Sequence, residues 1–158
     1  MPGGGPTRLI WRSRRVSHGT ITRHAVEDEF LLAGSKRTVL LYQPPTADPC
    51  PLLVVLDGQD YWRRARIANI VDNLITQGRI QPIALAMPYN GRGARGVEYA
   101  CSEATLVLLL YDLLELAQQE LNLVDIQANP GAHGILGASM EGPTQILTLH
   151  CHPAGHTA

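Results

Sequence analysis

A serine near the end of the chain has the surroundings of a catalytic nucleophile. Residues 135–143 read ILGASMEGP, an apolar run that leads through small residues to Ser139 and then to a proline. This pattern indicates a strand, a sharp turn that exposes a hydroxyl, and a helix with proline in its first turn. A serine presented in this way can attack a carbonyl carbon. Gly137 occupies the first glycine position of the G-x-S-x-G pattern, but Glu141 stands where the second glycine belongs.

Ser139 also has a purely structural interpretation, because serine is a common N-cap residue at the start of a helix. Glu141 bears on the catalytic one. Its Cβ would enter the close approach of strand and helix, and its charge would lie near a developing oxyanion. Either effect would reduce stabilisation of the transition state.

A second turn follows a strand that the sequence predicts to be buried. Asp57, Gly58 and Gln59 directly follow the apolar run 52–56, which suits a strand buried on both faces. Asp-Gly is also an ordinary turn pair, so this stretch could be only a connection. Tyr61 and Trp62 come next and could line a pocket or pack on a helix face.

The elements that must position these turns follow from patterning. Unbroken or β-branched apolar stretches predict strands, and apolar residues at helical spacing predict helices. Gly78 is placed to cap the first helix. The resulting order predicts an α/β layered domain with a largely parallel sheet, flanking helices, N-terminal antiparallel strands and right-handed crossovers. The expected strands are 18–31, 36–43, 52–56, 82–87 and 134–138, and the expected helices are 61–77, 102–117 and 143–149.

Composition narrows the possible partners. The 158 residues are 45% hydrophobic with a formal net charge of -1, which gives no reason to expect nucleic acid or a membrane surface as a partner. The three cysteines lack metal-ligand spacing, so no metal and no disulfide framework is predicted. Gly91–Gly96 match G-x-G-x-x-G, but the sequence around them does not fit a dinucleotide site. We therefore expect no cofactor. Without a secretory signal or a spanning segment, a cytoplasmic location is expected.

Four blocks, in this order and spacing, resemble one family. They are LDGQDYW (56–62), RGVEYACSEA (95–104), GASMEG (137–142) and the His152-Pro153 pair. Together they resemble the putative-esterase branch of the α/β-hydrolases, which includes enterochelin esterases that open siderophore esters. The resemblance implies a carboxylic-ester hydrolase acting on a small-molecule ester. It also implies Ser139 as nucleophile, the N–H groups of Met140 and Gln59 as oxyanion donors, and a substrate side formed by Asp57, Gly58, Tyr61 and Trp62.

The rest of a catalytic triad is harder to find. A serine needs a histidine that takes its proton and an acid that orients that histidine. His150 lies about 16 Å along the predicted helix, His152 and His156 follow it, and His133 precedes the strand at the opposite sheet edge. We therefore expect an incomplete α/β-hydrolase domain over 18–153, with a flexible segment 1–17, an unstructured tail 154–158 and very weak or no activity. The alternative is a non-catalytic remnant or interaction domain that self-associates through an exposed sheet edge.

Overall fold

A computed structural model describes residues 9–27, 36–91 and 103–137 of the chain, with only the backbone described over 103–109. The described part holds a sheet of five strands in the order β1-β2-β4-β3-β5. Two helices, α1 (Gly58–Arg63) and α2 (Ile67–Thr76), follow β3, and α4 (Glu103–Glu120) follows β4. The strands are β1 (Thr20–Glu27), β2 (Lys36–Gln43), β3 (Leu52–Val55), β4 (Ala84–Pro88) and β5 (Gly134–Leu136), and a short 3-10 turn, η3 (Pro130–Ala132), precedes β5.

The sheet is mixed. β1 and β2 pair antiparallel, as do β2 and β4, whereas β3 lies parallel to both β4 and β5. This confirms the expected α/β class, with antiparallel strands first and parallel strands after them. Because β3, β4 and β5 run the same way, their carboxyl ends meet at one edge of the sheet, where ligand sites of open α/β sheets form.

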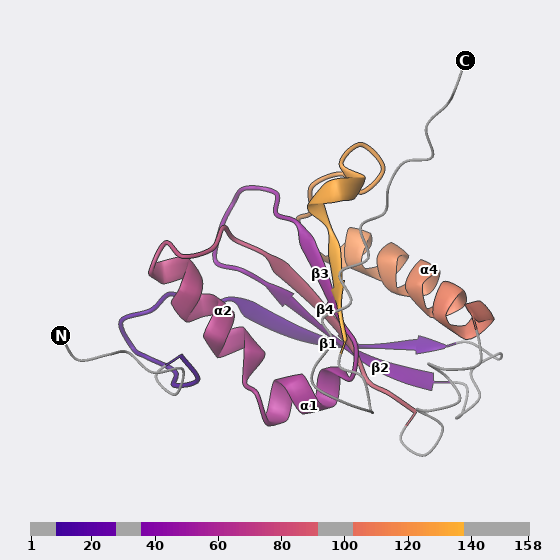
Figure 1. The fold of residues 1–158 in the computed structure, drawn as a ribbon, viewed down its shortest axis with the longest axis horizontal. Coiled ribbons are helices and arrows are strands. Elements are labelled where there is room, and N and C mark those ends of the chain that lie inside the picture. Colours follow the sequence, from indigo (N-terminus) through magenta and orange to yellow (C-terminus); the bar gives the residue numbers. More distant parts are fainter. Residues whose placement is uncertain (1–8, 28–35, 92–102, 138–158) are drawn as a thin grey trace.

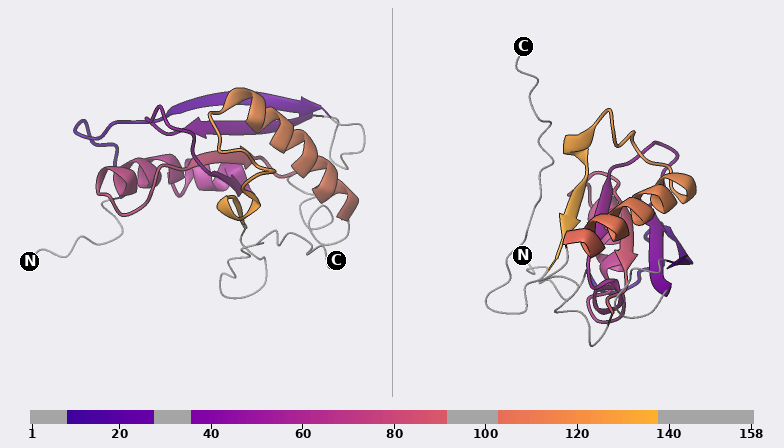
Figure 2. Two further views of the ribbon diagram at one scale, coloured as in Figure 1. Left: turned by 90° about the horizontal axis from the view of Figure 1, so that it is seen from above. Right: turned by 90° about the vertical axis from the view of Figure 1, so that its right-hand side faces the viewer.

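The core has two halves because neighbouring residues of a strand face opposite sides of the sheet. In β2, Val39 and Leu41 face the half that contains Leu113 and Ala117 of α4. Leu40 and Tyr42 face the half that contains α2. Figure 1 shows α2 and α4 flanking the strands, and the turned views of Figure 2 show the same layers. No described helix has the length and apolar character needed to cross a membrane.

The predicted helix 61–77 is wrong in two respects: it is two helices, and the first begins at Gly58. α1 ends at Arg63, and Arg66 then adopts a left-handed backbone conformation with φ of 50° and ψ of 47° before α2 begins. The Asp60 carbonyl accepts hydrogen bonds from the N–H groups of both Arg64 and Ala65, which closes α1. A left-handed residue cannot continue a right-handed helix, so the chain changes direction there.

Polar side chains of α2 hold the N-terminal segment 9–19. Asn73 Nδ2 donates to the carbonyl oxygens of Leu9 and Trp11, and Asn69 Nδ2 donates to that of Ile10. Further along the segment, the Gly19 N–H donates to the Asp72 carboxylate. The segment therefore lies along α2.

Candidate active site

The turn after β3 has an unusual backbone. Asp57 adopts the left-handed conformation, with φ of 58° and ψ of 40°, and its side chain is buried. Asn90, which lies just beyond β4, donates from Nδ2 to Asp57 Oδ1 over 2.7 Å. A left-handed non-glycine residue is strained, and such residues cluster at functional sites. Asp57 thus holds the turn against the exit of the neighbouring strand.

Only glycine fits at position 58, because a side chain there would overlap the backbone of β4. A Cβ built on Gly58 would lie 2.5 Å from the Met87 carbonyl oxygen and 2.6 Å from its carbonyl carbon. The turn therefore presses directly on the backbone of β4. This contact fixes the height of the next residue, Gln59, above the sheet edge.

Gln59 combines a fixed side chain with an open N–H group. Its Oε1 accepts a hydrogen bond of 3.0 Å from the Asn90 N–H, so the side chain braces the two strand exits. Its own N–H makes no hydrogen bond within the described part of the chain, since the Asp57 carbonyl accepts instead from Asp60 and Tyr61. An unpaired N–H in the first turn of a helix can donate to an anion.

β5 ends at the same edge, and Gly137, the first residue of the serine block, follows it. The Leu56 N–H donates to the Leu136 carbonyl over 2.9 Å, and Val55 is the register partner of Leu136. A Cβ on Gly137 would lie 3.3 Å from Leu56 Cδ1, so β5 leaves the sheet beside the turn. Ser139 and Met140 lie outside the described residues, as do Glu141 and the histidines of 150–156.

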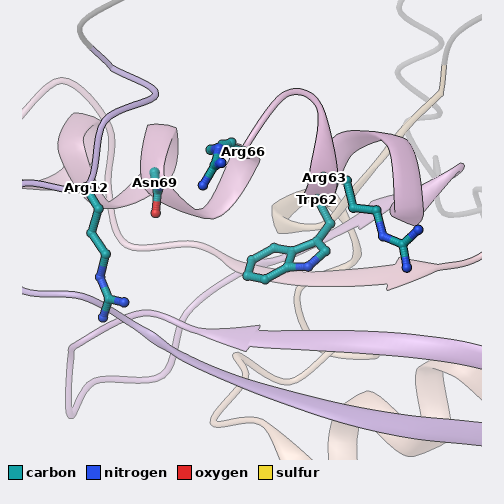
Figure 3. Close-up of a pocket in the computed structure, with 5 residues that line it drawn as sticks. All are labelled: Arg12, Trp62, Arg63, Arg66 and Asn69. Carbon is teal, nitrogen blue, oxygen red and sulfur yellow. The ribbon is translucent and has the colours of Figure 1, made fainter.

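Tyr61 and Trp62 are both partly buried and pack against the core half that contains α2. Trp62 has a second environment, because it also lines a hollow of about 430 Å³ with Asn69 and three arginines. Figure 3 shows the indole ring below the α1–α2 connection. Trp62 therefore packs on the helix face and also lines this hollow, and its part in a substrate pocket stays a prediction.

The described histidines form their hydrogen bonds away from the turn after β3. His133 precedes β5 at the opposite edge, where its Nδ1 accepts from the Leu52 N–H over 3.0 Å. Burial lowers the pKa of His133, and its buried Nε2 has no hydrogen-bond partner among the described residues. His24 bonds to Thr22 within β1.

His18 belongs to a buried network on α2. Its Nδ1 lies 2.9 Å from Asp72 Oδ2, and Tyr42 donates to Asp72 Oδ1 over 2.7 Å. Burial, followed by the Asp72 hydrogen bond, raises the pKa of Tyr42 far above its usual value. His18 Nε2 lies 2.9 Å from the Ser13 carbonyl oxygen, so both ring nitrogens have partners. The network secures the N-terminal segment. Among the described residues, no group of three or more His, Cys, Asp or Glu side chains could hold a metal ion.

Asn90 is the site residue that the sequence did not single out. Its signal is its position, because a short polar residue directly after a buried strand lies at the same sheet edge as the turn after β3. Its two contacts, to Asp57 and Gln59, span more than thirty positions of sequence.

Comparison with solved structures places this fold among α/β-hydrolase-type esterases. A ferulic acid esterase from Anaeromyces mucronatus superposes with a TM-score of 0.62 at 14% identity, over 84% of this chain and 53% of its own. The enterobactin esterase from Shigella flexneri gives 0.63 at 17% identity, over 75% of this chain and 30% of its own. An S-formylglutathione hydrolase from Staphylococcus aureus gives 0.52 at 14% identity, over 78% and 51%.

The sequence itself shows the family. Residues 32–155 match the family model described as "Putative esterase", and the chain belongs to that family. No curated protein matches the sequence. The matched part of the ferulic acid esterase is about half of that protein, and the matched part of the enterobactin esterase about a third.

Proposed function

We propose that the chain carries the nucleophile and oxyanion turns of a carboxylic-ester hydrolase. Ser139 is the nucleophile, and the N–H groups of Gln59 and Met140 receive the negative charge of the tetrahedral intermediate. Asp57 and Gly58 set the height of the Gln59 N–H, and Tyr61 and Trp62 form the substrate side. Membership of the esterase family and the esterase neighbours support this chemistry.

The observation that carries the proposal is the turn at the end of β3. In this turn Asp57 has a strained backbone, and Gly58 lies directly against the backbone of Met87. The Gln59 N–H makes no hydrogen bond within the described residues. The carbonyl of Leu136, three positions before Ser139, is bonded to the Leu56 N–H. Three residues of chain span at most about 11 Å, so the Ser139 backbone lies within that reach of Leu136. A preorganised N–H beside a nucleophile is what acyl transfer requires.

The reaction proposed is attack of the Ser139 hydroxyl on an ester carbonyl, with departure of the alcohol and formation of an acyl-enzyme. Water then releases the acid. A histidine base and an acid are needed for rapid turnover, and sequence spacing places no such pair beside Ser139. We therefore expect turnover by this chain at the residual level that oxyanion donors alone provide, about 10³- to 10⁴-fold above water.

Labelling with a fluorophosphonate tests the nucleophile directly. The folded protein is expected to incorporate the label slowly at Ser139, at the residual reactivity that the oxyanion donors provide, as located by peptide mass spectrometry. Ser139→Ala should remove the label, and Ser17→Ala, at an exposed serine of the N-terminal segment, should retain it. A folded protein that stays unlabelled at Ser139 would refute an activated serine.

A second candidate function is pairing with another copy of the chain through β5. Among the described strands, β5 pairs only with β3 and ends the sheet. A strand edge with free N–H and C=O groups is a template for another strand. Sedimentation velocity should then show a dimer that grows with concentration, and a concentration-independent monomer would exclude this function.

A further inference from the structure

The hollow beside α1 and α2 is basic and carries an aromatic ring. It is lined by Arg12 of the N-terminal segment, Trp62 and Arg63 of α1, Arg66 of the connection, and Asn69 of α2. Figure 3 shows the Trp62 indole extending towards the side on which Arg66, Asn69 and Arg12 lie, with Arg12 coming from a different part of the chain, whereas the Arg63 side chain extends the other way. Its volume of about 430 Å³ is in the range of small-molecule sites.

The three arginines have no acidic partner among the residues that the structure describes. Within the described ranges, no carboxylate lies within ion-pairing distance of Arg12, Arg63 or Arg66. The nearby acid Asp60 pairs instead with Arg64, at 3.6 Å. Like charges gathered around one hollow repel each other, and an anion that enters it removes this repulsion. Guanidinium groups bind carboxylates through paired hydrogen bonds.

The backbone adds to the positive character. Arg66 is the N-cap of α2, yet it provides no side-chain cap, and the first turn of the helix has no acidic residue. A helix N-terminus carries partial positive charge, so an arginine there is unfavourable. Arg66 is also held in the left-handed conformation. A residue that is unfavourable in both charge and conformation points to a role other than stability.

Trp62 defines what kind of anion fits. Its indole is the one large aromatic surface among the lining residues, and it is partly buried while the arginines are exposed. A flat ring can stack on the indole while its acidic groups reach the guanidinium groups at the rim. We propose that this hollow is a binding site for a small aromatic acid with two negative charges. The site shares Trp62 with the proposed esterase site but does not depend on Ser139.

The experiment uses Trp62 as its own reporter. Trp11→Phe leaves Trp62 as the remaining tryptophan of the two, and the Trp11 side chain is 71% exposed, so its loss should not disturb folding. This protein is titrated with benzene-1,3-dicarboxylate and followed by tryptophan fluorescence. We expect a saturable change that weakens with added salt. The neutral diamide of the same ring and the non-planar cyclohexane-1,3-dicarboxylate should each bind several-fold more weakly.

Two arginines two positions apart in sequence provide the matched pair. In the Trp11→Phe protein, Arg66→Gln should weaken binding of the dicarboxylate about three- to tenfold. Arg64→Gln removes the charge of a side chain outside the hollow and should leave binding unchanged. Both positions are exposed, and thermal melts confirm folding.

Three results would overturn the proposal: no saturable change up to roughly 10 mM dicarboxylate, equal binding of the diamide, or equal losses in the two arginine variants. Ser139→Ala should bind the dicarboxylate like its parent. Loss of fluorophosphonate labelling with intact dicarboxylate binding would refute only the esterase function, and the reverse result would refute only this site.

Discussion

Asp57 and Gly58 show two different ways in which single residues shape the turn after β3. Asp57 adopts a left-handed backbone conformation that is unfavourable for residues with a side chain. Its carboxylate accepts a hydrogen bond from Asn90. Gly58 has no side chain because the Met87 carbonyl occupies that space. Asp57 is thus strained but supported by Asn90, and Gly58 is fitted to the backbone of Met87. Both effects act on the position of the Gln59 N–H.

Gly58→Ala should therefore lower the free energy of unfolding by about 1–3 kcal/mol. The added methyl group meets backbone atoms of Met87, which cannot rotate away as a side chain would. Urea unfolding measures the loss. Gly131→Ala is the control, because nothing lies within 4 Å of a Cβ built there. A change within about 0.5 kcal/mol is expected for that variant, and equal values for the two variants would show that the turn has room.

His133 should make stability depend on pH. Burial lowers its pKa in the folded protein, so below about pH 6.5 the unfolded chain binds a proton that the folded chain does not. Stability should fall as the pH falls from about 6.5 towards the lowered value, and be independent of this group above that window. His133→Asn retains an acceptor for the Leu52 N–H and should flatten the curve.

Urea unfolding at several values between about pH 7.5 and 5 tests this expectation. His24→Asn is the control, because His24 forms only an exposed contact with Thr22. Parallel curves for the parent and His133→Asn would show that His133 does not contribute.

At the scale of elements, the two ends of α2 differ: its C-terminus is well capped, whereas its N-terminus begins at a residue with an unfavourable conformation. Its C-terminus is closed by Gly78 at φ of 65°, with the Gly78 N–H bonded to Ile75 and the Arg79 N–H to Leu74. This is the usual way in which glycine ends a helix. Its N-terminus begins at Arg66, which has the same left-handed backbone without a glycine.

Arg66→Gly should raise the free energy of unfolding by about 1 kcal/mol, because glycine adopts φ above zero without strain. Gly78→Ala should lower it by a similar amount, although nothing lies within 4 Å of the added Cβ. Thermal unfolding of the two variants provides the test. If Arg66→Gly is destabilised, Arg66 is held by contacts stronger than its strain.

The helices and strands could largely be predicted from the sequence, but the breaks and contacts between them could not. β2, β3 and β4 lie within two residues of the expected bounds because prolines and glycines bracket their apolar runs. The break at residues 64–66 was missed because arginine and alanine favour helices and no glycine or proline marks it. At the site, the Asp57–Gln59 turn follows from the end of a strand, whereas the Asn90 contacts depend on β3 and β4 being neighbours.

At the scale of the whole molecule, the Asp72 network joins three distant parts of the chain. His18, Tyr42 and Asp72 come from the N-terminal segment, β2 and α2, and the pair His18–Asp72 is 54 positions apart. No local pattern in the sequence reveals such a contact. The chain also spans about half the length of the ferulic acid esterase that it resembles.

Asp72→Ala should lower the free energy of unfolding by at least about 2 kcal/mol, since buried donors of Tyr42 and Gly19 lose their acceptor. The N-terminal segment should also become easier to cleave, which limited proteolysis with mass spectrometry can locate. Asp48→Ala, at an exposed position of the loop before β3, is the control and should resemble the parent in both measurements. Unchanged cleavage in Asp72→Ala would show that Asn69 and Asn73 suffice.

The grip of α2 on residues 9–11 has a consequence for variation in this region. Asn69 and Asn73 bond to carbonyl oxygens, which every amino acid carries, and the Trp11 side chain points largely into solvent. Substitutions in this stretch should therefore be well tolerated, whereas inserting or deleting one residue would shift every carbonyl away from its amide. The side chains of this stretch can therefore vary, but the number of its residues cannot.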